Sequence, residues 1–96
     1  MKLKNNFSDI TRALFSFEHS CWVCGSNQGC ELHHILGRIS SSPFNACVLC
    51  RKCHEKATTL HKEKLLKMAI KFCIREQYEP NKTDIKFYQD NKKMYE

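Results

Sequence analysis

Four cysteines of this sequence are arranged in two pairs with the spacing of a metal site. Cys21 and Cys24 form one CxxC pair, Cys50 and Cys53 form a second, and 25 residues separate the pairs. A CxxC turn can place two thiolates on one tetrahedral ion, so the two pairs together predict a zinc site. Four thiolates leave no open coordination position for a substrate. We therefore expect this zinc to stabilise the fold and to take no part in catalysis.

Two alternatives bear on this ligand set. A thioredoxin-like redox pair also has the CxxC spacing, but it belongs to a strand and helix context that this sequence lacks, and two pairs favour a metal. Cys47 lies three residues before Cys50 and so forms another formal CxxC. We favour Cys50 with Cys53, because Cys47 lies in an apolar run where a thiol usually acts as a small hydrophobe. Cys30 and Cys73 are interpreted in the same way.

Three histidines accompany the cysteine pairs. His33 and His34 are adjacent, and His54 directly follows Cys53. Adjacent residues of a strand point to opposite faces, so His33 and His34 are expected to have different roles. One imidazole can bind a metal together with His54, which leaves positions for water and phosphate. The other, free of metal and titrating near neutral pH, can remove a proton from water.

The order of these residues resembles that of the HNH endonuclease family, in its zinc-ribbon-bearing form with a ββα-metal core. A CxxC pair, the His-His pair, Asn45 before an apolar run, and the sequence CxxCH follow one another within residues 21–54. The resemblance covers residues 21 to about 58. It implies that His33 and His54 bind a catalytic divalent ion, that His34 is the general base, and that Asn45 orients this base.

The resemblance also implies the reaction, which is hydrolysis of nucleic-acid phosphodiester bonds to 5′-phosphate and 3′-hydroxyl ends. DNA is the preferred substrate, and small proteins of this kind often come from phages or mobile elements. The catalytic ion is expected to be Mg²⁺ or Mn²⁺, although two imidazoles also suit Zn²⁺ or Ni²⁺. One departure is Thr58, where many members of the family carry a further histidine. The identity and affinity of the catalytic metal therefore stay open.

Three basic residues lie in or beside the motif and are candidates for contacts with flanking phosphates. They are Arg38, Arg51 and Lys52. Arg51 and Lys52 equally suit solvated positions between the two cysteines of the second pair. A non-catalytic zinc-binding module, which recognises nucleic acid or a protein, is the alternative function. This alternative explains the four cysteines and the net charge. It gives no common role to His33, His34, Asn45 and His54.

The elements expected to position these residues form a small α+β fold, with a ββα-metal core and helices on either side of it. We expect one domain over residues 1–96, with an N-terminal helix within 1–19, a zinc-stapled core over 20–60, and a helical extension over 61–96. Short strands are predicted at residues 32–36 and 46–49, joined by a turn over 37–43 that is rich in serine and contains Gly37 and Pro43. The fold suggests that this turn lies over the minor groove or the backbone of the nucleic acid.

The helices are predicted from capping residues and from apolar residues three or four positions apart. Ser8 can cap a short amphipathic helix that ends near Glu18, along which Ile10, Ala13, Leu14 and Phe17 recur three or four positions apart. A helical pattern begins at His54 and must end at Pro80. A further helix capped by Thr83 is predicted in the tail. The expected buried face of the long helix comprises Leu65, Leu66, Ala69, Ile70, Cys73 and Ile74, and the phenylalanines assigned to the core are Phe7, Phe15, Phe17 and Phe72. Trp22 is expected to pack over the zinc site.

Length and composition agree with a small nucleic-acid-binding protein. A chain of 96 residues buries too little apolar surface to be stable by hydrophobic burial alone, so disulfides or a metal site are expected. The net charge of +6 fits a polyanionic partner. No apolar run reaches the length of a signal peptide or of a membrane span, which leads us to expect a cytoplasmic protein with reduced thiols and no membrane partner. The sequence does not show whether the protein forms homo-oligomers.

Overall fold

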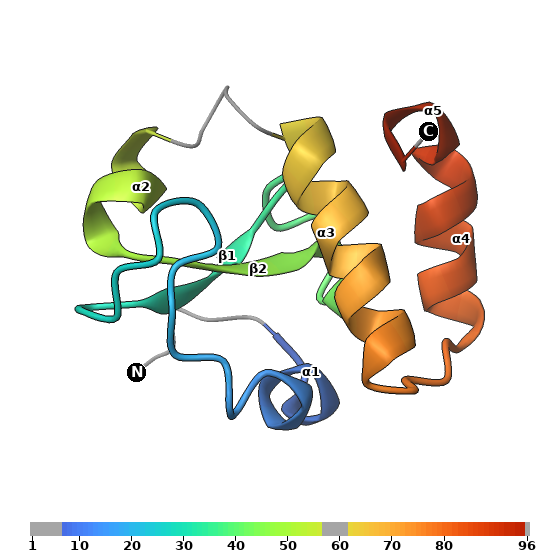
Figure 1. The fold of residues 1–96 in the computed structure, drawn as a ribbon. Coiled ribbons are helices and arrows are strands. Elements are labelled where there is room, and N and C mark those ends of the chain that lie inside the picture. The colour runs from blue at the N-terminus through green and yellow to red at the C-terminus, as the bar shows by residue number, and fades with distance from the viewer. Residues whose placement is uncertain (1–6, 57–61, 96) are drawn as a thin grey trace.

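The computed structural model describes residues 7–56 and 62–95 of the chain, and shows two short strands surrounded by helices (Figure 1). Thr58 and the 57–60 part of the expected core lie outside the described residues. The strands pair in one antiparallel sheet, and the architecture is therefore small, compact and α+β, as predicted. In chain order the elements are α1 (Asp9–Leu14), β1 (Glu31–His34), the 3₁₀ helix η1 (Pro43–Asn45), β2 (Ala46–Leu49), α2 (Arg51–Lys56), α3 (Lys62–Arg75), α4 (Lys82–Asp90) and α5 (Lys92–Tyr95).

The two strands differ sharply in burial. Register pairs Glu31 with Leu49 and His34 with Ala46. All four residues of β2 are buried, whereas each residue of β1 is exposed or partly exposed. A strand buried on both faces is typical of a sheet covered on each side. In β1 the polar side chains instead reach the surface, where they are available for chemistry.

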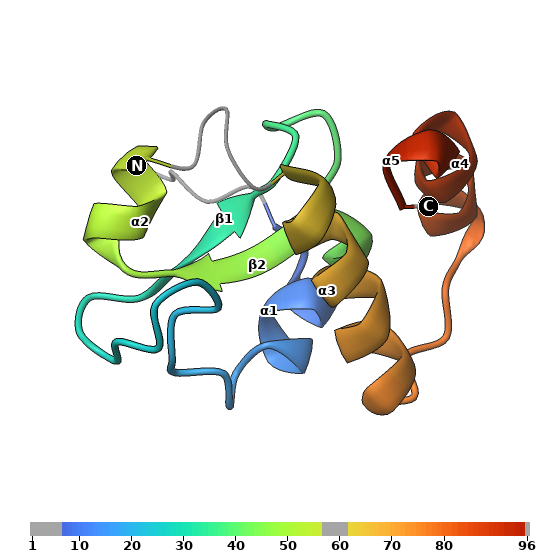
Figure 2. The same cartoon turned by 45° about the horizontal axis from the view of Figure 1, so that its top comes forward.

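Helix α3 forms the main wall of the core and lies between the sheet on one side and α4 and α5 on the other (Figures 1 and 2). Its buried residues are Leu65, Leu66, Ala69, Phe72 and Cys73. The predicted face was wrong at Ile74, which is 70% exposed. In this part of the helix the buried side chains are those of Phe72 and Cys73. The helix also ends at Arg75, five residues before Pro80. Gln77 has a φ of 59°, and Tyr78 N–H donates to Cys73 O at 2.9 Å, which closes the last turn.

Helix α1 begins as predicted but is shorter than predicted. The Ser8 side chain accepts a hydrogen bond from Thr11 N–H and so caps the helix. Thr11 is fully buried, and its hydroxyl donates to Ser41 O at 2.9 Å. Burial of Thr11 and Phe15 turns Phe17 outward, where it is 88% exposed, and the assignment of Phe17 to the core was wrong.

The C-terminal helices pack on α3 and on η1. Asn81, two residues before the predicted Thr83, is the N-cap of α4. Its side chain accepts from Asp84 N–H, and the Asp84 carboxylate accepts from Asn81 N–H, each at 2.9 Å. This reciprocal capping box satisfies two backbone donors that the start of a helix would leave unpaired. Tyr95 then donates its hydroxyl to Phe44 O at 3.0 Å and ties α5 to η1.

Candidate functional site

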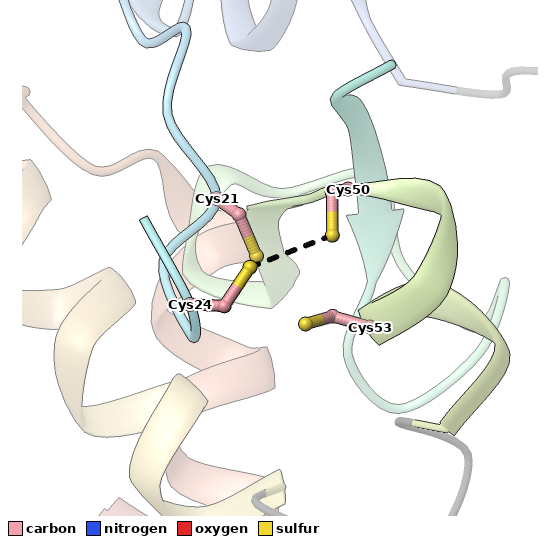
Figure 3. A group of neighbouring side chains, drawn as sticks. All are labelled: Cys21, Cys24, Cys50 and Cys53. Atoms are coloured by element: carbon pink, nitrogen blue, oxygen red, sulfur yellow. Dashed lines mark hydrogen bonds between the residues drawn. The ribbon is translucent and has the colours of Figure 1, made fainter. Parts of the chain in front are cut away.

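The four cysteines of the two CxxC pairs come together at one end of the sheet. Cys21 and Cys24 lie in the loop after α1, Cys50 follows β2, and Cys53 lies in α2 (Figure 3). Their sulfur atoms all lie within 4.8 Å of one another. Among the described residues, this is the one group of three or more potential ligands that converges so closely.

Local backbone geometry explains how the first pair turns. Gly25 has a φ of +81°, a conformation that favours glycine, and its N–H donates to Cys21 O at 2.9 Å. Val23 N–H points to Cys21 Sγ at 3.4 Å. Trp22 N–H donates to Val48 O at 2.8 Å, which attaches the turn to β2 beside the second pair. The Trp22 ring packs towards the core, 5.6 Å from the Phe72 ring.

Distances and pKa values in this cluster are compatible with a structural zinc. A tetrahedral ion with bonds to sulfur of about 2.3 Å holds its ligands about 3.8 Å apart. Cys24 Sγ and Cys50 Sγ are 3.6 Å apart. Burial alone would raise the pKa of Cys21, but hydrogen bonds from the surrounding backbone, at Cys24, Cys50 and Val23, outweigh it and lower the pKa to about 6. The thiolate is the form of cysteine that binds a metal, so a site that stabilises the Cys21 thiolate favours metal binding.

The remaining cysteines lie outside this cluster, as predicted. Cys47 is fully buried in β2, and burial raises the pKa of its thiol well above the usual range. Cys73 is buried in α3, where burial raises its pKa to about 12. The Cys30 thiol donates to Ser26 O at 3.1 Å. Each of the three therefore behaves as a thiol that packs or donates, and not as a metal ligand.

A cleft of about 600 Å³ lies on the β1 and α2 side of the molecule. It contains all three histidines of the motif, although His54 is 20 residues from His34 in the sequence. The residues that line it are Glu31, Leu32, His33, His34, Gly37, Arg38 and His54. Arg51 and Lys52 are exposed in the first turn of α2 and are not among these lining residues.

His33 and His54 face each other across the cleft. Their ring centroids are 4.5 Å apart, with the rings at 66°. Burial, together with the positive charges of His54, His34 and Lys62, lowers the pKa of His33 to about 4. At neutral pH this imidazole is therefore uncharged, which is the form that binds a metal.

His34 lies in a different environment from its neighbour. Its ring stacks on Phe7, with centroids 3.7 Å apart and planes at 5°. Burial, and next the positive charge of Arg38, lower the pKa of His34. Its Nε2 atom is buried and has no hydrogen-bond partner within the described part of the chain. The lowered pKa favours the uncharged imidazole, which is the form that can accept a proton.

Asn45 is fully buried and organises the turn between the strands. Its Oδ1 accepts from Leu36 N–H at 2.9 Å, and its Nδ2 donates to Gly37 O and Ser40 O, both at 3.0 Å. Within the described residues these side-chain bonds all go to the turn and not to the His34 ring. Asn45 therefore fixes the backbone that follows His34 and carries Arg38.

Glu31 lines the cleft, and it was missed in the sequence analysis. It lies two residues before His33 in β1, so the two side chains share one face of the strand. Its Oε1 atom is 3.7 Å from His54 Nδ1. The alternation of side chains along a strand could have identified Glu31, because it places this carboxylate on the same face as His33, a candidate metal ligand.

The chain matches no protein-family model, and no curated protein or solved structure matches it. The resemblance to the HNH family thus depends on the sequence motif alone. Along the described part of the chain, the helices are too short or too polar for a bilayer span.

Proposed function

We propose that this protein is a metal-dependent endonuclease of the HNH type. The observation that carries the proposal is the meeting of His33, His34 and His54 in one cleft that also contains Arg38. The succession of β1, β2 and α2 supports a ββα-metal core, since His33 and His34 lie on the first strand and His54 on the helix. The four-cysteine cluster at the end of β2 holds the structural zinc in this proposal.

The neighbouring imidazoles of His33 and His54 fit a divalent ion, because their rings lie 4.5 Å apart and the lowered pKa of His33 keeps that ring in the form that binds metal. An ion bound there would polarise the scissile phosphate and stabilise the departing 3′ oxygen. Mg²⁺ and Mn²⁺ are the preferred ions, with Zn²⁺ or Ni²⁺ as alternatives that suit imidazole ligands better.

The residues of the chain supply the remaining steps. His34 accepts a proton from water, the resulting hydroxide attacks phosphorus, and the bond from phosphorus to the 3′ oxygen breaks. Asn45 holds the turn so that Arg38 stays at the rim of the cleft, where its guanidinium can bind a phosphate oxygen. Arg51 and Lys52 extend this positive surface along α2. DNA is the preferred substrate, and an origin in a phage or a mobile element is part of the proposal.

The test is nicking of supercoiled plasmid in Mg²⁺ or Mn²⁺ by the zinc-loaded protein and by the variant His34→Ala. We expect the variant to lose at least about a hundredfold in rate, the usual contribution of a general base. His19→Ala is the matched control, because His19 is exposed and lies outside the lining of the cleft. It should nick at the unaltered rate.

The opposite result would support a different function. If the unaltered protein cut neither plasmid, branched DNA nor RNA with any of these ions, the nuclease proposal would be rejected. The four-cysteine cluster would then favour a zinc-binding module that recognises nucleic acid or a protein without cutting it.

A further inference from the structure

Glu31 is a carboxylate that the proposed reaction does not yet use, and it lies next to a candidate metal ligand. It occupies the first position of β1, opposite Leu49. Its side chain is 61% exposed, and its Oε1 atom approaches His54 Nδ1 to 3.7 Å. The contact joins the strand that carries His33 to the helix that carries His54.

We propose that Glu31 is a positioning residue that accepts a hydrogen bond from Nδ1–H of His54. The present distance is longer than a hydrogen bond, and a small rotation of the exposed Glu31 side chain closes it to about 2.8 Å. A proton held on Nδ1 leaves the lone pair of neutral His54 on Nε2. The imidazole then presents a single nitrogen, in a fixed orientation, to an ion shared with His33.

The geometry favours this role over direct ligation by the carboxylate. Among the described residues, ligand atoms of Glu31, His33 and His54 do not all converge within 4.8 Å, whereas those of the four cysteines do. A carboxylate behind a ligating histidine also raises the basicity of the ring and removes its rotational freedom.

The inference rests on the proposed metal site for its function, but the hydrogen bond can be measured on protein that carries one zinc per chain, in the cysteine cluster, and no ion at His33 and His54. Nitrogen NMR of the zinc-loaded protein, at mildly alkaline pH, shows which nitrogen of neutral His54 carries the proton. We expect the Nδ1–H form in the unaltered protein, and a shift to the Nε2–H form in Glu31→Ala. Glu31→Gln keeps an oxygen that can accept the bond, so it should largely retain the Nδ1–H form.

Binding of Mn²⁺, followed by electron paramagnetic resonance, gives the consequence for the metal. Loss of a carboxylate that orients a ligand typically weakens metal binding about 10- to 100-fold. We expect a loss of this size in Glu31→Ala and a smaller loss in Glu31→Gln. Glu79→Ala is the control, because Glu79 is exposed between α3 and α4 and should leave both measurements unchanged.

The outcomes separate this inference from the proposed function. An Nε2–H form in the unaltered protein, or a tautomer that Glu31→Ala leaves unchanged, would overturn the role of Glu31. Equal loss of Mn²⁺ affinity in the Gln and Ala variants, with an unchanged tautomer, would overturn it in favour of direct ligation. Absence of Mn²⁺ binding in the unaltered protein, with the Nδ1–H form present, would support the hydrogen bond and count against the nuclease.

Discussion

The environment of His34 sets the pH range in which it can act as a base. Burial is the largest cause of its lowered pKa, and the guanidinium of Arg38 adds to it by disfavouring a second positive charge. A general base must be unprotonated before it accepts a proton. In the proposed reaction, a lowered pKa therefore keeps His34 in the form that accepts a proton below the pH at which an ordinary histidine becomes protonated.

We expect Arg38→Gln to move the acidic limb of the pH profile of kcat/KM to higher pH. Removal of the positive charge lets the pKa of His34 rise towards its usual value, so more acid-side activity is lost at a given pH. The midpoint of the limb, measured for both proteins, checks the sign. Arg12→Gln is the control, since Arg12 pairs with Asp9 on α1 outside the cleft. An acidic limb at the same pH in Arg38→Gln as in the unaltered protein would contradict the electrostatic account.

At the scale of elements, the cysteine cluster brings helix α2 against the loop that follows α1. It links the loop after α1, the end of β2 and the start of α2 (Figure 3). Helix α2 has only six residues, and an isolated helix of that length is unstable in water. An ion bound by the four cysteines would therefore fix the position of His54, which directly follows Cys53.

We expect Cys53→Ser, or treatment with a strong chelator, to abolish the cooperative thermal transition. Structural zinc in small domains contributes on the order of 10 kcal/mol, comparable to the whole stability of a domain. Circular dichroism during heating and the zinc content by mass provide the measurement. Cys30→Ser should keep one zinc and melt almost as the unaltered protein does. Full folding of the zinc-free protein would contradict a structural role.

Much of this arrangement could be predicted from local sequence, and the predictions that failed did so for physical reasons. The spacing of Cys21, Cys24, Cys50 and Cys53 predicted the cluster, because a CxxC turn is a short-range geometry. Periodicity failed at Phe17, because burial of the polar Thr11 depends on a hydrogen bond to Ser41, thirty positions away. Glu31 was missed for a similar reason, since its partner His54 becomes a neighbour only after the strand and helix pack.

At the scale of the whole molecule, the C-terminal helices extend the core rather than the cleft. Helices α4 and α5 lie on the far side of α3 from the sheet (Figure 2). The longest dimension of the fold is 33 Å, close to one turn of B-form DNA at about 34 Å. The fold is thus long enough to contact at most about one turn, and in the proposed function one copy, with one active site, cuts one strand.

Tyr95 connects the end of the described chain to the core, and we expect Tyr95→Phe to lower the free energy of unfolding by about 1 kcal/mol. The lost hydrogen bond to Phe44 O leaves a carbonyl unpaired. For a domain of this size the melting temperature should fall by about 4–8 °C, by calorimetry. Tyr88→Phe is the control, because the Tyr88 hydroxyl makes no hydrogen bond within the described residues. A fall of equal size there would show that the loss of stability does not come from the hydrogen bond to Phe44 O.

The unequal burial of the two strands has an evolutionary consequence. Residues of β2 are enclosed on every side, so almost any replacement there disturbs the interior. Residues of β1 hold the same ladder through their backbones, while their side chains are exposed or only partly buried. Natural variation can therefore exchange the reactive groups of β1 while the neighbouring strand preserves the scaffold, and new chemistry can be explored without loss of the fold.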